Sequence, residues 1–115
     1  MNYSFKELYT RFSNISEEDI SKRVQNKYPR QTVDYIKGFL ASIIKNPELA
    51  LKYYIEPQDI ALVLDVYGIN AEGKRLSQAQ IAKKYDITMG RVTARFASVV
   101  QTAKHQQTAD EDLKL

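Results

Sequence analysis

Residues 76–104 constrain the fold more than any other stretch, because they contain two closely spaced helix starts. Ser77 is followed three residues later by Gln80, the reciprocal arrangement of a capping box. Thr88 offers the cap of a second helix only eleven residues beyond Ser77. Between them, Asp86 stands where the backbone must turn left-handed, a conformation that Asp tolerates better than most other residues. The stretch therefore predicts two short helices joined by a tight turn.

The second of these helices has one regular apolar face. Its apolar side chains recur at helical spacing, at Val92, Phe96, Val99 and Ala103. Two capped helices, a tight turn and a basic outer surface are typical of a helix-turn-helix that enters the major groove of DNA. An ordinary helical hairpin inside another all-α domain is the alternative that this pattern leaves open.

Further elements surround this pattern: a Pro-led helix start, a Tyr-Gly helix end, a short polar loop, a Leu-Ser start and a second start around Arg91. They are Glu56-Pro57, Tyr67-Gly68-Ile69, Asn70 to Arg75, Leu76-Ser77 and Ile87 to Val92. With these elements, residues 56–104 resemble region 4 of bacterial sigma factors. The resemblance covers about two fifths of the chain and implies a helix-turn-helix that docks in the major groove. The chain is too short to include the sigma modules that open promoter DNA.

The resemblance also implies which residues contact DNA. Arg91 is the polar base reader of the family that stands in place, and a guanidinium can bridge two acceptors of guanine. The other reading positions, often Arg, Glu, Arg and Gln in the family, hold different residues here, so the base preference does not carry over. We expect further base or backbone contacts from Thr88, Met89, Gly90, Thr93 and Ala94. We expect phosphate contacts from Lys74, Arg75, Lys83, Lys84 and Arg95.

The distribution of charge supports this interpretation. Residues 73–104 hold seven Lys or Arg against one Asp, a net charge of +6, whereas the whole chain has +3. Residues 1–72 are close to neutral, at −1, and residues 105–115 carry −2. A basic excess that coincides with the motif is the electrostatic footprint expected for phosphate binding. A solvated helical surface is the alternative.

Several classes of function are disfavoured by composition. The chain has no cysteine, which excludes disulfides and thiolate metal sites, and its single histidine, His105, cannot build a multi-histidine site. No apolar run approaches the roughly 20 residues that span a bilayer, and no signal-peptide pattern is present. The glycines are isolated and form no phosphate-binding loop. We expect a cytoplasmic protein that is not an enzyme and holds neither a metal nor a cofactor.

The first half of the chain predicts a helical core without strands. Expected helices cover residues 4–12, from 16 to the proline at 29, 31–45, 46–54 and 57–67. Gly38 lies inside the longest apolar stripe, where a close helix crossing is one reason for a glycine. We interpret the tyrosines of this half as packing residues, with a self-association surface as the functional alternative; they are Tyr3, Tyr9, Tyr28, Tyr35, Tyr53 and Tyr54.

The prediction is an all-α, small multi-helix domain with a C-terminal helix-turn-helix. Residues 1–55 form an N-terminal helical region for dimerisation or polymerase docking, 56–105 the sigma region 4-like part, and 106–115 a flexible tail. The expected function is a transcription regulator that binds double-stranded DNA, from a phage, plasmid or other mobile element. The chain also resembles the small Mor-type phage activators, which combine a dimerising N-terminal region with a C-terminal helix-turn-helix. The alternative is a module that binds RNA polymerase or a sigma factor without reading DNA.

Overall fold

The protein is all-helical, as the sequence predicts. The computed structural model describes residues 3–25 and 27–113, and no strand occurs among them. The helices are α1 (Phe5–Ser13), α2 (Glu17–Val24), α3 (Arg30–Lys45), α4 (Glu48–Lys52), α5 (Pro57–Tyr67), α6 (Gln78–Tyr85) and α7 (Met89–Leu113).

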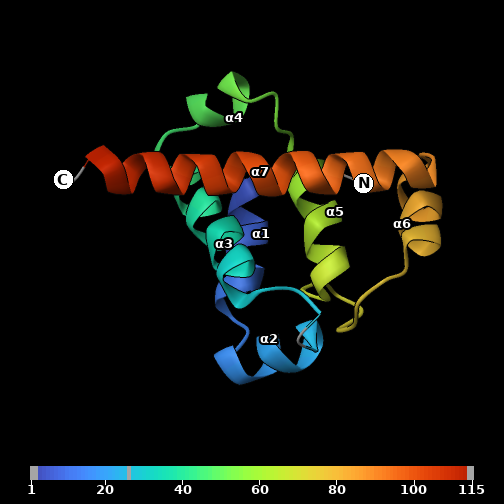
Figure 1. Ribbon diagram of the computed structural model, residues 1–115. Helices are drawn as coiled ribbons and strands as arrows, with labels where there is room; N and C mark the ends of the chain where they lie inside the picture. Colours follow the sequence, from blue (N-terminus) through green and yellow to red (C-terminus); the bar gives the residue numbers. More distant parts are fainter. Residues whose placement is uncertain (1–2, 26, 114–115) are drawn as a thin grey trace.

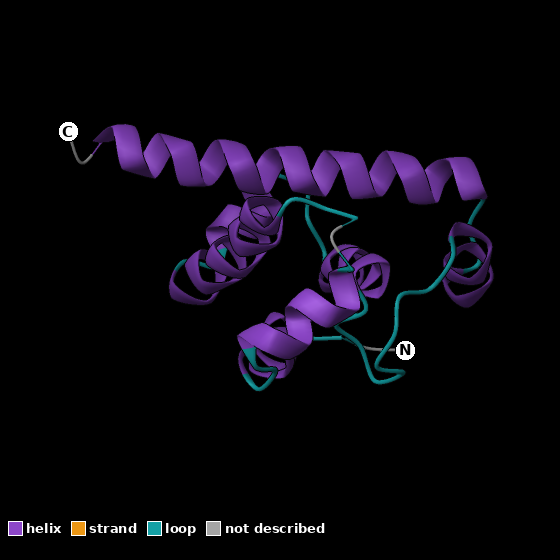
Figure 2. Ribbon diagram, turned by 60° about the horizontal axis from the view of Figure 1, so that its bottom comes forward, coloured by secondary structure: helices purple, strands orange, loops and turns teal. Residues whose placement is uncertain are grey.

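The long C-terminal helix α7 determines the shape of the molecule. Its 25 residues rise about 37 Å, close to the longest extent of the fold, 41 Å. Figure 1 shows α7 running across the whole molecule, with α6 folded back beneath its first turns. In the rotated view of Figure 2, the shorter helices lie below α7 and leave its upper side open.

A large hydrophobic core joins the two halves of the chain. It takes buried side chains from every helix except α6, and α3 packs along α7 more extensively than any other pair of helices. Phe39 and Leu40 of α3 and Val99 of α7 are among its buried members. The regions 1–55 and 56–105 therefore share one core and pack as a single body.

Local capping signals place most of the helix ends. The Ser16 hydroxyl accepts a hydrogen bond from the Asp19 amide at 3.1 Å, and Gly68 ends α5 in the left-handed conformation, both as expected. The end of α2 differs from the prediction. This helix ends at Val24 instead of reaching Pro29, because Gln25 already adopts a left-handed backbone, with φ of 55°.

The expected loss of helix after Lys104 is wrong. α7 continues to Leu113, so the predicted flexible tail from residue 106 is helical over its described part, while residues 114–115 lie outside the described residues. The reason is polar packing that apolar periodicity does not reveal. The Tyr53 hydroxyl donates a hydrogen bond to Gln106 at 3.0 Å. The Gln107 side chain lies against Gly38, where any Cβ would overlap it, which confirms the close crossing of α3 and α7.

Most of the tyrosines pack as predicted. Tyr28 lies edge-on to Tyr67, with ring centroids 5.3 Å apart, and Tyr53 packs edge-on against Phe39. Tyr54 is the exception, since its side chain is 86% exposed and its backbone is left-handed, with φ of 56°. An exposed aromatic therefore projects from the loop between α4 and α5.

Candidate nucleic-acid interface

The connection between α6 and α7 is built by the local signals that the sequence contains. The Ser77 hydroxyl accepts from the Gln80 amide, and the Gln80 side chain accepts from the Ser77 amide at 2.8 Å, which completes a capping box. Asp86 ends α6 with φ of 56°. The Thr88 hydroxyl then accepts from the Arg91 amide at 3.1 Å and caps α7. With these caps, only three residues, 86–88, separate the end of α6 from the beginning of α7.

A small hydrophobic core fixes α6 against α7. It consists of Leu62 from α5, Ile81 and Ala82 from α6, and Val92 from α7. On the surface above it, the Gln78 carboxamide donates to the Met89 carbonyl oxygen at 2.7 Å and also to the Thr93 hydroxyl. The first turns of α7 are thus held from below by apolar contacts and from one side by Gln78. The role of Gln78 could not be predicted from the sequence, because nothing local links it to residues 11 and 15 positions away.

All the residues expected to read bases are exposed. They are Thr88, Met89, Gly90, Arg91, Thr93 and Ala94. A Cβ added at Gly90 would meet no atom within 4 Å, so packing within the described part of the chain does not require glycine at this position. The beginning of α7 therefore offers a solvent-facing surface of small or flexible side chains around one arginine.

Helical geometry divides this surface into two sides. Met89 and Thr93, four residues apart, lie on the side of Gln78. Arg91 lies on the other side of the helix, where with Glu56 and Asp59 it lines shallow depressions beside α5. Among the described residues the Arg91 guanidinium has no ion pair and no hydrogen bond, so it is free to bind a ligand.

Two of the expected phosphate contacts are engaged inside the protein. The Lys84 ammonium lies 3.1 Å from Asp65 and 3.4 Å from Glu72, and its side chain is only 21% exposed. Arg95 binds Asp59 through two nitrogens, at 2.7 and 3.1 Å. Lys84 and Arg95 each neutralise a carboxylate inside the protein, which makes them less available for a phosphate than the exposed cations.

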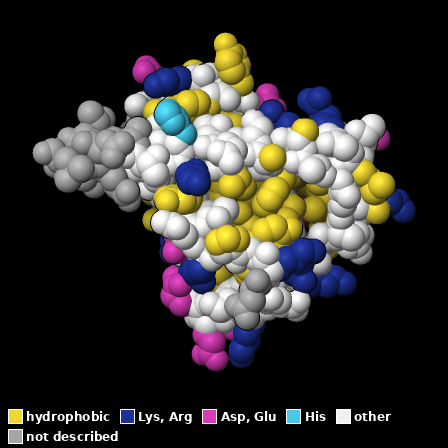
Figure 3. Space-filling view, viewed as in Figure 1, with side chains coloured by type: hydrophobic (Ala, Val, Ile, Leu, Met, Phe, Trp, Pro, Cys, Tyr) yellow, Lys and Arg dark blue, Asp and Glu magenta, His cyan; other side chains and the backbone are white. Residues whose placement is uncertain are grey.

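The other cations expected to contact phosphate differ in how exposed they are. Lys74 and Lys83 are exposed, whereas Arg75 is half-buried and donates a hydrogen bond to the Gln25 side chain at 2.8 Å. The structure adds Lys27, which together with Arg75 lines a hollow below α7. Figure 3 shows apolar side chains gathered in this hollow and Lys and Arg side chains along its border. Nothing in the sequence places Lys27 near residues 76–104, because it precedes α3 and is remote from them along the chain.

Asp65 is the centre of a buried polar cluster that attaches α6. Its carboxylate accepts hydrogen bonds from Asn70 at 2.9 Å, from Lys84 at 3.2 Å and from the Tyr85 hydroxyl at 2.5 Å. Burial and the hydrogen bond to Asp65 raise the pKa of Tyr85 above its ordinary value. The pKa of Lys84 is also raised, by Asp65 against the opposing effect of burial. The cluster is a structural link between α5 and α6.

The described part of the chain has neither a candidate metal site nor a candidate membrane span. Among the residues whose side chains the structure describes, 3–25 and 27–108, no group of three or more His, Cys, Asp or Glu side chains is arranged to hold a metal ion. No helix in residues 3–25 and 27–113 has the length and apolar character needed to cross a bilayer. No protein-family model, curated protein sequence or solved structure matches the chain.

Proposed function

We propose that the chain is a DNA-binding transcription regulator that inserts the first turns of α7 into the major groove. The observation that carries the proposal is the unpaired guanidinium of Arg91, exposed on a capped helix start that α6 and Gln78 hold in place. The major groove of B-DNA is about 12 Å wide and admits an α-helix. α6, α7 and their tight connection then act as a helix-turn-helix, with α7 as the recognition helix.

Phosphate contacts follow from the cations that the fold leaves accessible. These are Lys74 and Lys83, which are exposed, and Arg75 and Lys27, which line the same hollow below α7. Contacts of this kind set the register of the protein on DNA and carry no base preference. Base selectivity must come from Arg91, aided by contacts of Met89, Thr93 and Ala94 with thymine methyl groups or backbone.

The salt dependence of binding to mixed-sequence duplex DNA tests the proposal. If four phosphates are neutralised, the logarithm of the affinity falls with the logarithm of salt concentration at a slope of about −3.6. Fluorescence anisotropy of a labelled duplex between 50 and 200 mM salt, a window over which several phosphate contacts change affinity strongly, measures this slope. An affinity that does not depend on salt would exclude phosphate binding.

Single substitutions separate the two kinds of contact. Lys83→Ala should weaken binding to every sequence and reduce the slope by about 0.9. Arg91→Ala should cost about 1–3 kcal/mol on the preferred site and relax selectivity at one base pair. Lys45→Ala, an exposed cation at the end of α3, is the matched control and should change neither quantity. The preferred site comes from selection of bound duplexes from a random pool.

The selected sites also report on the assembly. One recognition helix reads few base pairs, so two copies that bind together would select half-sites one helical turn, about 34 Å, apart. A single short site would instead indicate a monomer or a complex with another DNA-bound protein.

The second candidate function is binding to RNA polymerase or a sigma factor without reading DNA. The exposed apolar pair Leu51 and Tyr54 favours it, since these side chains are 77% and 86% exposed and line a surface depression together with Arg91. Sedimentation of the chain with RNA polymerase, with and without the substitution Tyr54→Ser, measures this interaction. Co-sedimentation that Tyr54→Ser abolishes, together with salt-independent DNA affinity, would favour the second candidate over the first.

A further inference from the structure

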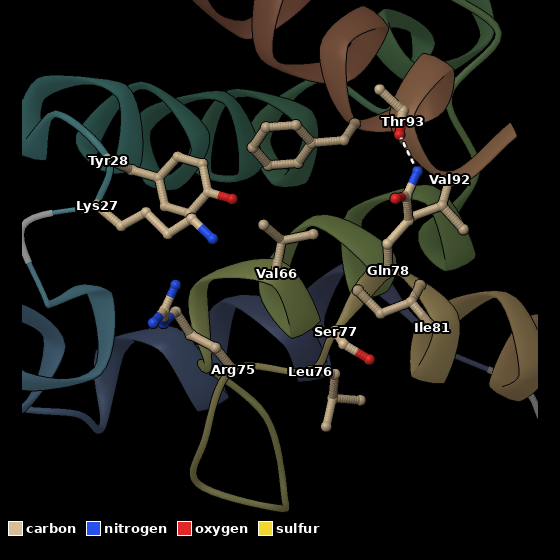
Figure 4. Close-up of a pocket in the computed structure, with 11 residues that line it drawn as sticks. Lys27, Tyr28, Val66, Arg75, Leu76, Ser77, Gln78, Ile81, Val92 and Thr93 are labelled. Atoms are coloured by element: carbon tan, nitrogen blue, oxygen red, sulfur yellow. Dashed lines mark hydrogen bonds between the residues drawn. The ribbon is translucent and has the colours of Figure 1, made fainter. Parts of the chain in front are cut away.

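A cavity of about 290 Å³ opens between α5, α6, α7 and the segment that connects α2 to α3. Figure 4 shows side chains from these elements converging on it, and Figure 3 shows the same region as an apolar hollow on the surface. The volume lies at the lower limit of the roughly 300–1,000 Å³ typical of ligand pockets. A ligand of this cavity is therefore restricted to about one or two rings.

The floor of the cavity is apolar and incompletely covered. Ile81 and Val92 are buried, but four other apolar side chains are only half-buried and remain accessible from the cavity; they are Tyr28, Val66, Leu76 and Phe96. Two of these residues, Tyr28 and Phe96, are aromatic, with ring centroids 5.6 Å apart. A flat apolar ligand would cover this surface and gain free energy from its burial.

The rim of the cavity is polar and carries charge of one sign. Lys27 and Arg75 are both lining residues, and no Asp or Glu contributes to the lining. Ser77, Gln78 and Thr93 supply uncharged polar groups from α6 and α7. Apolar walls with a few convergent polar groups are characteristic of sites for small organic ligands. The two cations make the site complementary to an anion.

We propose that this cavity binds a small aromatic organic anion, whose ring lies against Tyr28, Val66 and Phe96 and whose carboxylate or sulfonate lies beside Lys27 and Arg75. The site does not depend on DNA binding, because it is formed by the folded chain alone. The cavity shares Lys27, Arg75 and Thr93 with the proposed DNA contacts, so ligand and DNA would compete for these residues. A titration of the probes without DNA still separates the two proposals, because it measures ligand binding alone.

The test uses the full chain and two probes of the same shape. The probes are 1-naphthoate and its uncharged analogue 1-naphthalenemethanol, titrated into ¹⁵N-labelled protein and followed by amide chemical shifts. We expect saturable shifts at Tyr28, Val66 and Thr93, and a dissociation constant about fivefold lower for 1-naphthoate than for the alcohol. Equal affinity for both probes, or shifts confined to the surface around Leu51 and Tyr54, would overturn the proposal.

Two kinds of variant assign the binding to the cavity. Lys27→Gln should raise the dissociation constant of 1-naphthoate about fivefold and leave that of the alcohol unchanged, whereas the control Lys45→Gln should alter neither. Val66→Phe should fill the cavity and abolish binding of both probes, and Leu76→Phe, at another lining residue, provides a second filling variant. Undiminished binding of both probes by a folded filling variant would overturn the proposal.

Discussion

The large core and the small core of this molecule are stabilised by different kinds of contact. The large core consists of apolar side chains from α1, α2, α3, α4, α5 and α7, such as Phe39, Leu40 and Val99, with little or no exposed area. The small core holds α6 with few buried apolar residues. The polar cluster of Asp65 with Lys84 and Tyr85 supplements it.

The difference shows how a short helix can be oriented without a large apolar surface. Apolar burial is roughly proportional to area and is not directional. The hydrogen bonds of Asp65 are directional, so they set the position of α6 relative to α5. Because α6 supports the exposed start of α7, the proposed DNA contact depends on these polar bonds as well as on the large core, in which α7 packs. Helices with few buried apolar contacts are also expected to open locally before the rest of a protein.

The largest effect should come from the substitution Phe39→Ala in the large core. Phe39 is fully buried, so its truncation should cost about 3–5 kcal/mol of the free energy of unfolding and destabilise the whole protein.

Ile81→Ala in the small core should cost about 2–3 kcal/mol of the free energy of unfolding and should favour local opening of α6. Urea unfolding measures the two losses. Native-state hydrogen exchange should show that α6 amides exchange through a local opening of lower free energy than the global unfolding that exposes α3 amides, and one common free energy for both helices would contradict two separable cores.

A smaller effect is expected when the charge at the centre of the polar cluster is removed. Asp65→Asn leaves the partly buried Lys84 ammonium with only Glu72 as its anionic partner, which should cost about 2–3 kcal/mol. The double variant Asp65→Asn with Lys84→Met should lose less than the sum of the single variants, because neither charge is then left unpaired.

The neighbouring lysine provides the matched control for this experiment. Lys83 is exposed, so Lys83→Met should change the free energy of unfolding by no more than about 0.5 kcal/mol. Strictly additive losses from Asp65→Asn and Lys84→Met would show that the ion pair does not attach α6.

The same contrast explains which features could be predicted from the sequence. Caps at Ser77, Asp86 and Gly68 depend on groups within about four residues, so the local pattern was sufficient to predict them. The partners of Lys84 and Arg95 are 19 and 36 residues away, at Asp65 and Asp59. Both cations therefore counted toward a basic surface in the sequence, although the fold neutralises them.

The cavity and the end of α7 were missed for a related physical reason. Lys27 and Arg75 come from segments that the sequence gives no reason to bring together. Residues 105–108 carry no apolar stripe. Within them, Gln106 accepts a hydrogen bond from the Tyr53 hydroxyl, and the Gln107 side chain lies against Gly38. Hydrophobic periodicity detects apolar contacts, and it does not detect a helix end held by polar ones.

The smallest predicted effect is a loss of stability at alkaline pH, to which one tyrosine of each core contributes. Burial raises the pKa of Tyr67 in the large core, and burial with the Asp65 hydrogen bond raises that of Tyr85 beside the small core. Both pKa values lie above the unfolded value of about 10, so the folded state retains protons that the unfolded state releases. The contribution of each tyrosine to stability should be constant below about pH 10 and should fall by about 1.4 kcal/mol per pH unit above it.

Phenylalanine variants show which core contributes each part of this slope. Tyr67→Phe and Tyr85→Phe should each reduce the alkaline slope by about 1.4 kcal/mol per pH unit in urea unfolding between pH 8 and 11. At pH 7 they should differ in sign. Tyr85→Phe loses its hydrogen bond to Asp65 and about 1 kcal/mol, whereas Tyr67→Phe removes a buried hydroxyl without a partner among the described residues and should gain stability. An alkaline slope that neither substitution alters would show that both tyrosines ionise without loss of the fold.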